Sequence, residues 1–285
     1  MTDLPHGFLR WKSYAEFAGA QALLAQEWRG QQAFQQQWLA NARERVLGGW
    51  CAACGRDALF ALDGAVGEEP NWRESLTCNH CGMTARWRSS AHLYALLAGA
   101  HAPGPVYMTE QATPLHALMR ARLPGLIGSE YLGPGVAGGA LVERHGLSLR
   151  HEDVTALSMA DASLGAILSF DVLEHVPDWR AALREFARTL KPGGLLLLTA
   201  PFHFGARDTV VRARIGADGG IEHLLPPVYH GDPLSTDGVL CYQEFAWDLL
   251  DALAAAGFAR TEVISCWSAA YGYLGGVHPF IVGWR

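Results

Sequence analysis

Two pairs of cysteines carry the most specific chemical signal in the sequence. Cys51 and Cys54 form one Cys-x-x-Cys pair, Cys78 and Cys81 form a second, and a glycine directly follows each pair. A two-residue gap lets both thiolates of a turn face one point, and the glycine relaxes the backbone there. Two such turns supply a closed tetrahedral set of four sulfur ligands, which suits Zn²⁺ and leaves no open position. The spacing therefore predicts a structural zinc site, against the alternative of reduced cysteines without a metal.

The chain around these cysteines has too little apolar content for a core of its own. We expect a four-cysteine zinc-binding module over residues 50–90, which the metal would help to fold. Residues 1–49 are expected to be a helical segment, with a helix over 13–47 that ends at Gly48-Gly49. Aromatic residues recur along this helix. They need a partner surface in the rest of the chain, in a second copy of it, or in another protein.

From about residue 91 to residue 285 the pattern becomes that of an α/β domain. Short apolar runs alternate with helical stretches, which indicates a Rossmann-like, mostly parallel sheet flanked by helices. The expected strands are 105–109, 126–129, 147–151, 166–170, 195–199, 262–265 and 280–283. The expected helices are 114–122, 179–190 and 243–256. An insertion at about 202–242, with a hairpin turn at 217–220, interrupts this alternation.

Residues 166–201 form the clearest strand–helix–strand unit of this domain. The first strand ends at Phe170-Asp171, a helix follows, and Lys191–Gly194 turns the chain into a second apolar strand. Ligands of such sheets bind outside the carboxyl ends of the strands. Asp171 and Pro201–His203 are therefore expected at the rim of a site.

Two short segments of this unit carry a resemblance to a known family. Asp171–Asp178 reads DVLEHVPD, and Leu190–Gly194 reads LKPGG. Glu174 and Asp178 are typical of a helix start, the role we expect for Asp178. His175 is expected to be a packing histidine, with a catalytic base as the alternative. Both segments resemble the motifs around the fourth and fifth strands of the class I S-adenosylmethionine-dependent methyltransferases, of the type 11-like group.

The resemblance covers roughly residues 103–285 and implies a methyl donor, S-adenosylmethionine, held by acidic residues at successive strand ends. It implies that Asp153 lies near the adenine amino group, that Glu130 binds the ribose hydroxyls, and that Glu110 opens the first motif. Glu110 and Glu130 are 20 residues apart, which suits one strand–helix–strand repeat. The implied cofactor-binding residues, each acidic residue with its neighbour, are Glu110, Gln111, Glu130, Tyr131, Asp153, Val154, Asp171 and Val172.

The loop after the first strand departs from the family pattern. The family has a glycine-rich loop there, because glycine lets the backbone approach the donor closely. Here Glu110–Pro114 contains no glycine, although Thr113 and Pro114 suit a helix start. Either the side chain of Gln111 replaces backbone contacts, or the donor binds weakly or not at all.

The insertion is rich in histidine, with His203, His223 and His230 as candidate catalytic residues. A histidine of near-neutral pKa can deprotonate a hydroxyl acceptor, and this is one hypothesis. His223, His230 and a carboxylate could instead bind a second metal, or the histidines could lie on the surface of a lid. Arg212 and Arg214 alternate along the hairpin and suit an anionic acceptor or a solvated face.

Composition excludes several classes of protein. Half of the residues are hydrophobic, which excludes a disordered or collagen-like chain. The net charge is −6, which disfavours binding of nucleic acid by phosphate neutralisation. We see no secretory signal and no run of about 20 apolar residues, so a cytoplasmic protein without a membrane partner is expected.

Three functions remain open. The first is methylation, at oxygen, of a small-molecule or glycan acceptor. The second is a non-catalytic methyltransferase-like binding module, which the glycine-free loop favours. The third is an RNA methyltransferase, for which Arg73, Arg86 and Arg88 near the cysteines would offer a basic cluster.

Overall fold

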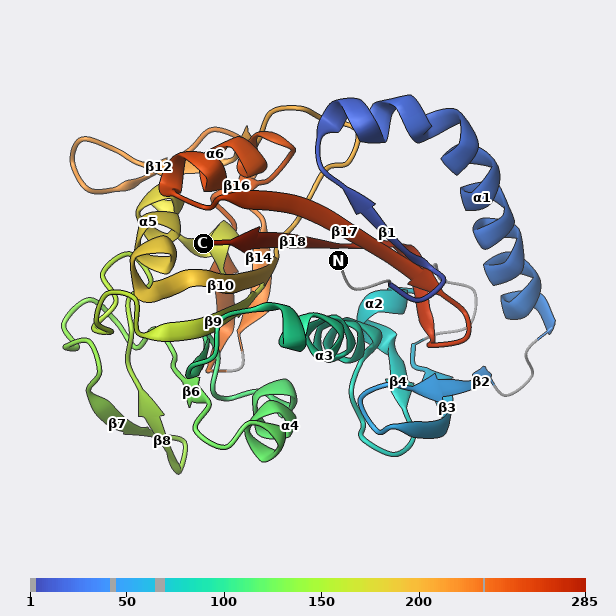
Figure 1. Ribbon diagram of the computed structural model, residues 1–285, viewed down its shortest axis with the longest axis horizontal. Helices are drawn as coiled ribbons and strands as arrows, with labels where there is room; N and C mark the ends of the chain where they lie inside the picture. The colour runs from blue at the N-terminus through green and yellow to red at the C-terminus, as the bar shows by residue number, and fades with distance from the viewer. Residues whose placement is uncertain (1–3, 42–44, 65–69, 233) are drawn as a thin grey trace. The chain divides into compact units, whose positions relative to one another are not determined.

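The computed structural model describes residues 4–41, 45–64, 70–232 and 234–285, and Figure 1 shows their helices and strands. The chain divides into two compact units. Unit 1 comprises Met1–Ala100 and Val263–Pro279, and unit 2 comprises His101–Glu262 and Phe280–Arg285. The cysteine-bearing segment and the N-terminal helix thus share a unit with residues that the sequence pattern assigns to the α/β domain.

Four parallel strands form the centre of unit 2. Their order is β10 (Leu190–Thr199), β9 (Leu164–Phe170), β5 (Val106–Met108) and β6 (Ile127–Gly128). β18 (Tyr273–Trp284) pairs antiparallel with β10 through its last four residues. All seven residues of β9 are buried, as its apolar run predicts for a strand covered on both faces. The expected α/β fold with a mostly parallel sheet is confirmed.

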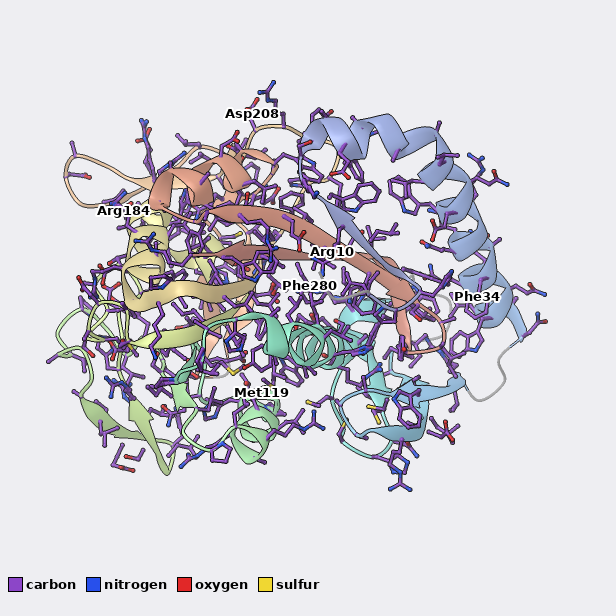
Figure 2. All side chains as sticks on the ribbon, in the orientation of Figure 1. Arg10, Phe34, Met119, Arg184, Asp208 and Phe280 are labelled. Atoms are coloured by element: carbon purple, nitrogen blue, oxygen red, sulfur yellow. The ribbon has the colours of Figure 1, made fainter. Side chains whose placement is uncertain are left out.

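Three helices of unit 2 form within the ranges that the sequence predicts. They are α4 (Pro114–Arg122), α5 (Trp179–Thr189) and α6 (Asp248–Ala256). The Thr113 hydroxyl accepts a hydrogen bond from the His116 amide at 3.2 Å, and the Asp178 carboxylate accepts one from the Ala181 amide at 2.9 Å. Both predicted N-terminal roles are confirmed. Figure 2 shows the side chains on these elements, including the exposed Arg184 of α5.

The structure corrects the start of the last helix. A helix was expected over 243–256, but it begins at Asp248, because Gln243–Glu244 (β16) pairs antiparallel with Val210–Val211 (β11). The predicted hairpin of the insertion is confirmed as β12 (Ala213–Ile215) and β13 (Ile221–His223). The other two-stranded pairs are β14 (Tyr229–Asp232) with β15 (Ser235–Leu240), and β7 (Leu141–Arg144) with β8 (Leu147–Arg150).

Unit 1 combines helices with a small sheet around the cysteines. Its elements are β1 (Phe8–Trp11), α1 (Tyr14–Asn41), β2 (Val46–Cys51), β3 (Arg56–Leu62), α2 (Trp72–Ser75), β4 (Leu76–Cys78), α3 (Ala85–Leu97), the short 3₁₀ helix Ala98–Ala100 and most of β17 (Arg260–Ser268). The expected helix over 13–47 ends at Asn41, and residues 42–44 lie outside the described part of the chain. Gly48 and Gly49 do not end a helix, since they pair with Leu59 and Ala58 inside β2 and β3.

The long helix α1 finds its packing partners within unit 1. The ring of Phe17 contacts that of Trp11 at 5.5 Å, and Trp38 contacts Trp72 at 5.6 Å. Gln35 accepts hydrogen bonds from the Trp267 indole at 2.9 Å and from the Gly275 amide. These contacts favour the intramolecular alternative for the aromatic residues of α1.

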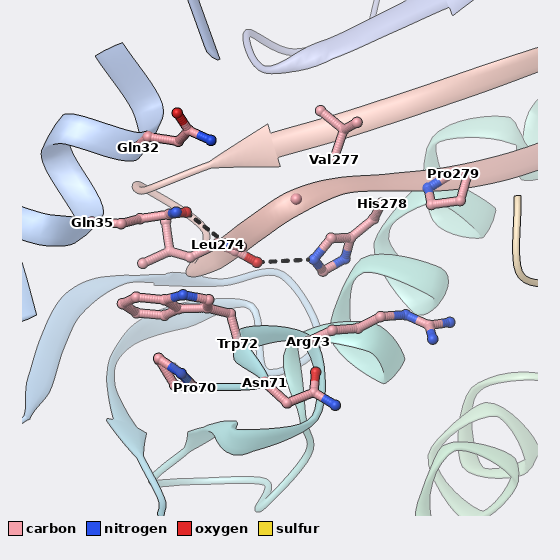
Figure 3. A pocket seen from close by; sticks show the side chains of 12 residues that line it. Gln32, Gln35, Pro70, Asn71, Trp72, Arg73, Leu274, Val277, His278 and Pro279 are labelled. Carbon is pink, nitrogen blue, oxygen red and sulfur yellow. Dashed lines mark hydrogen bonds between the residues drawn. The ribbon is translucent and has the colours of Figure 1, made fainter. Parts of the chain in front are cut away.

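A cavity of about 370 Å³ opens beside α1 in the same unit (Figure 3). Its wall includes Gln35, Trp72 and His278, and the His278 ring lies 3.2 Å from the Leu274 carbonyl oxygen.

Over the described residues, no helix combines the length and the apolar character that crossing a bilayer requires.

Candidate functional site

Acidic residues gather at the carboxyl edge of the parallel strands of unit 2. Glu110 follows β5 and is buried, Glu130 follows β6, and Asp171 directly follows β9. The chain moves from β5 to β6 on one side and returns to β9 on the other, so the strand order reverses between β5 and β9. In open α/β sheets, ligands bind at this reversal. The three carboxylates therefore stand where the fold places a ligand.

The glycine-free loop after β5 is held by side chains of the protein itself. Glu130 Oε1 accepts hydrogen bonds from the backbone amides of Gln111 and Ala112, both at 2.7 Å. The Gln111 side chain donates to the Ser148 carbonyl at 3.0 Å and accepts from the Arg150 amide at 2.9 Å. Glu130 thus binds the loop amides, and both polar atoms of the Gln111 side chain bond to the backbone of β8.

Asp153 lies near the same edge. Glu130 forms an isolated parallel bridge with His151, two residues before Asp153. Asp153 Oδ1 accepts hydrogen bonds from the Thr155 amide at 2.8 Å and the Thr155 hydroxyl at 2.7 Å. Tyr131 is exposed, and partial burial and the Asp153 charge raise the pKa of its hydroxyl. The remaining two implied residues, Val154 and Val172, are half-buried.

Asp171 occupies an unusual backbone conformation at the end of β9. Its φ is +53°, in the left-handed region that non-glycine residues seldom adopt. The Thr199 hydroxyl donates to its carboxylate at 3.0 Å, and its amide donates to the Thr199 carbonyl at 2.9 Å. These two bonds fix Asp171 against the end of the neighbouring strand β10.

Three residues after Asp171, the loop holds a buried carboxylate that the sequence pattern attributes to a helix start. The Glu174 side chain has no exposed surface, and neither carboxylate oxygen accepts a well-formed hydrogen bond among the residues that the structure describes. Its Oε1 lies 3.4 Å from His230 Nδ1 and 3.7 Å from His175 Nε2. Burial raises the pKa of Glu174, as does the charge of Asp171, while the two histidines lower it.

The insertion and the residues after it secure the loop that carries Glu174. The Tyr242 amide donates to the Glu174 carbonyl at 2.8 Å. The Gln243 side chain donates to the carbonyls of Leu173, at 2.8 Å, and Val176, at 3.1 Å. Since these bonds join segments far apart in the chain, the sequence alone gives no signal for them.

The three candidate histidines have different surroundings. His230 contacts Glu174, as above. His203 Nε2 lies 2.7 Å from Glu244 Oε2, whose other oxygen is 2.8 Å from Arg212 Nη1. His223 is exposed on β13 and joins no cluster of potential metal ligands in the described residues. Among the described residues, the group that could hold a second metal is therefore Glu174, His175 and His230, and it does not include His223.

The four cysteines of unit 1 converge as their spacing predicts. The Sγ atoms of Cys51 and Cys81 are 4.0 Å apart, those of Cys54 and Cys78 are 3.9 Å apart, and all four lie within 4.8 Å of one another. The glycine after each pair has a positive φ, +68° at residue 55 and +67° at residue 82. A hydrogen bond from the Cys51 thiol is the main cause that lowers the pKa of Cys81 to about 5.

The arginines near the cysteines do not form an exposed basic cluster. Arg88 is fully buried, and Arg86 and Arg73 both contact the carboxylate of Glu74, at 2.7 Å and 3.6 Å. The feature that would support an RNA methyltransferase is therefore absent at these three residues, because Arg88 cannot reach a ligand.

Comparisons with known proteins agree with the motifs in unit 2. Residues 135–198 match the family model described as a methyltransferase domain. A protein of Mycolicibacterium smegmatis described as a probable S-adenosylmethionine-dependent methyltransferase is 34% identical over 55 residues, which are 19% of this chain and 21% of that protein. The chain thus matches about a fifth of the length of this curated relative.

Solved methyltransferases also align with the chain. An S-adenosylmethionine-dependent methyltransferase from Mesorhizobium loti aligns with a TM-score of 0.43 at 15% identity, covering 71% of this chain and 98% of that one. The 1,6-didemethyltoxoflavin-N1-methyltransferase of Burkholderia thailandensis aligns with a TM-score of 0.41 at 17% identity, covering 80% and 95%. The matched family model and the motif of residues 171–178 thus show that this part of the chain is similar to the S-adenosylmethionine-dependent methyltransferases.

Proposed function

We propose that this chain is a methyltransferase that uses S-adenosylmethionine to methylate a hydroxyl of a small-molecule or glycan acceptor. The observation that carries the proposal is the set of carboxylates at the reversal of strand order, Glu110, Glu130 and Asp171, in a chain whose residues 135–198 match a methyltransferase domain. The donor is a sulfonium cation, and three negative side chains at one edge provide an attractive potential for it. When bound, the donor supplies an electrophilic methyl group.

The chain's own residues give this edge a candidate base. His203 follows the end of β10, and a carboxylate partner at 2.7 Å favours the tautomer with the proton on Nε2. Nδ1 then holds the lone pair and is our candidate to accept the proton of the acceptor hydroxyl. Glu244 fixes the ring, and Arg212 in turn holds Glu244.

We further propose that the four cysteines bind a structural Zn²⁺. With Zn–S bonds of about 2.3 Å, a tetrahedral site has sulfur–sulfur separations of about 3.8 Å. The separations of 4.0 Å and 3.9 Å come close to this value. The His80 amide also donates to Cys78 Sγ at 3.4 Å, as suits a thiolate ligand. Four protein ligands leave no position for a substrate, so the role is structural.

A non-catalytic binding module is the second candidate, and one observation favours it. Glu130, the residue that the family resemblance assigns to the ribose hydroxyls, already accepts hydrogen bonds from the Gln111 and Ala112 amides. If the Glu130 carboxylate only holds the loop, the carboxyl edge of the sheet has one hydrogen-bond acceptor fewer for the ribose hydroxyls of S-adenosylmethionine.

Calorimetric titration of the full chain with S-adenosylmethionine, and separately with S-adenosylhomocysteine, distinguishes the two candidates. We expect binding of both, and an affinity about tenfold lower in Glu130→Gln, which keeps an oxygen for the loop but removes the charge. Glu143→Gln, an exposed change on β7, serves as the matched control and should bind like the unmodified protein. Absence of heat and of any shift in melting temperature with either ligand would favour the binding module.

A further inference from the structure

The contact of Glu174 with two histidines has the composition of a metal site. Glu174 offers a carboxylate oxygen, and His175 and His230 each offer a ring nitrogen, all within 4.8 Å of one another. The His230 side chain is 34% exposed and His175 is 14% exposed, so the buried carboxylate meets a face that a small ion can reach. We propose that Glu174, His175 and His230 bind a divalent first-row transition-metal ion.

The observed separations suit such an ion. Bonds of about 2.1 Å from one metal to nitrogen and oxygen ligands give ligand–ligand separations between about 3.0 Å and about 3.7 Å for angles from about 90° to about 125°. Glu174 Oε1 lies 3.4 Å from His230 Nδ1 and 3.7 Å from His175 Nε2. These two values are also too long for well-formed hydrogen bonds between the same atoms.

The ring of His175 is already oriented as a metal ligand. Its Nδ1 lies 2.8 Å from the carbonyl oxygen of Leu240, so Nδ1 carries the proton and donates it. Nε2 then presents its lone pair toward Glu174. Metal-bound histidines characteristically donate their second ring nitrogen to a carbonyl or a carboxylate, which fixes both tautomer and orientation.

A bound cation would also balance the buried negative charge of Glu174. A fully buried carboxylate that accepts no well-formed hydrogen bond from the described residues is costly, unless a positive charge balances it. Two imidazoles and one carboxylate suit manganese, iron, cobalt or zinc, and soft thiolate ligands are not needed.

The place of the cluster suggests what the ion would bind. Glu174 and His175 belong to the short 3₁₀ helix Leu173–His175 that follows β9, at the strand end beside the reversal of strand order, and His230 comes from β14. Three protein ligands leave one or more coordination positions open in a four- to six-coordinate ion. An acceptor oxygen, from a hydroxyl or a pair of neighbouring hydroxyls, would fill them. This last assignment rests on the proposed methyltransferase function, while the metal site itself does not.

Cobalt(II) binding to the full chain tests the site. The protein is first loaded with one equivalent of Zn²⁺ for the four cysteines, and Co²⁺ does not displace zinc there because it binds more weakly to such sites. We expect one Co²⁺ per chain by equilibrium dialysis, without the intense absorption that sulfur-bound cobalt gives. Glu174→Gln and His230→Gln should each weaken this binding at least tenfold. His223→Gln, an exposed histidine of the same insertion, is the matched control and should leave Co²⁺ binding unchanged.

Each outcome decides the matter. No Co²⁺ uptake, or uptake of equal affinity in Glu174→Gln and His230→Gln, overturns the metal site, whereas the donor titration can still succeed. Acetohydroxamate, a chelator with two oxygen ligands, should shift the Co²⁺ absorption bands if positions are open. An unchanged spectrum overturns the open coordination. If Co²⁺ binds but titration with S-adenosylmethionine shows no binding, the metal site stands and the proposed methyltransferase function is contradicted.

Discussion

Arg88 holds a positive charge deep inside unit 1, where the described residues surround it with carbonyl oxygens rather than carboxylates. Its guanidinium donates to the carbonyls of Met83, Leu76, Tyr271 and Gly272 at 2.6–3.2 Å. The Phe60 ring lies 4.0 Å from its central carbon. Burial lowers the pKa of Arg88, and the charges of Tyr273 and of cysteines of the cluster raise it. A zinc ion with four thiolates carries a net charge of about −2, so Arg88 supplies a buried counter-charge to the proposed site.

We expect Arg88→Lys and Arg88→Met each to destabilise unit 1 by about 3 kcal/mol, because neither side chain reproduces the planar fork and several buried carbonyls lose their donor. Urea unfolding followed by tryptophan fluorescence measures the change. Arg86→Lys is the matched control two residues earlier on α3, where a partly exposed pair with Glu74 contributes at most about 1 kcal/mol. A loss in Arg88→Lys no larger than in Arg86→Lys contradicts the role given to the guanidinium.

At the scale of single elements, α5 shows how one motif residue can be structural. Asp178 ends the segment DVLEHVPD, yet its side chain is 67% exposed and caps α5 through the Ala181 amide. Asp178→Ala should destabilise unit 2 by about 1 kcal/mol, since the first turn of the helix loses its acceptor. Asp178→Asn keeps an acceptor of similar capping strength and should be nearly neutral. Equal losses in the two variants, by chemical denaturation, would show that charge rather than capping matters.

Elements whose conformation is determined by residues adjacent in the sequence could be predicted from the sequence. The apolar run of β9, the Thr113 cap of α4 and the turn before β13 all follow from local chemistry. β1 could not be predicted, because its four residues are strand only through pairing with residues 263–266. For the same reason β16 replaced the first turn of the expected last helix.

The candidate site divides in the same way. The cysteine cluster follows from the two short gaps within its pairs, so its convergence was predictable. The contacts of Glu174 and Glu130 were not predictable, because they depend on how the insertion packs against Glu174 and how the loop after β5 packs against Glu130. A glutamate and a histidine side by side after a strand, with further histidines in an insertion, is the signal that could have pointed to Glu174.

On the scale of the whole molecule, the two units differ in what stabilises them. Unit 2 buries an entire strand, β9, and the run Leu195–Thr199 of β10. The cysteine-bearing part of unit 1 depends on a three-stranded sheet and four thiols, and its fully buried apolar side chains include Phe60, Leu76 and Met83. A segment with so small a core needs a cross-link or a metal to hold its fold.

Removal of zinc should therefore affect unit 1 selectively. After treatment with a chelator at neutral pH, we expect the amides of the β3–β4 pairing to lose protection from hydrogen exchange, because the folding free energy of this segment is metal-binding free energy. Amides of the β9–β10 pairing should keep their protection. Cys81→Ser should reproduce the effect without chelator. Cys241→Ala, a buried cysteine outside the cluster, should retain one zinc per chain at the cysteines. Equal loss of protection in both units, or none around β3, contradicts a structural zinc.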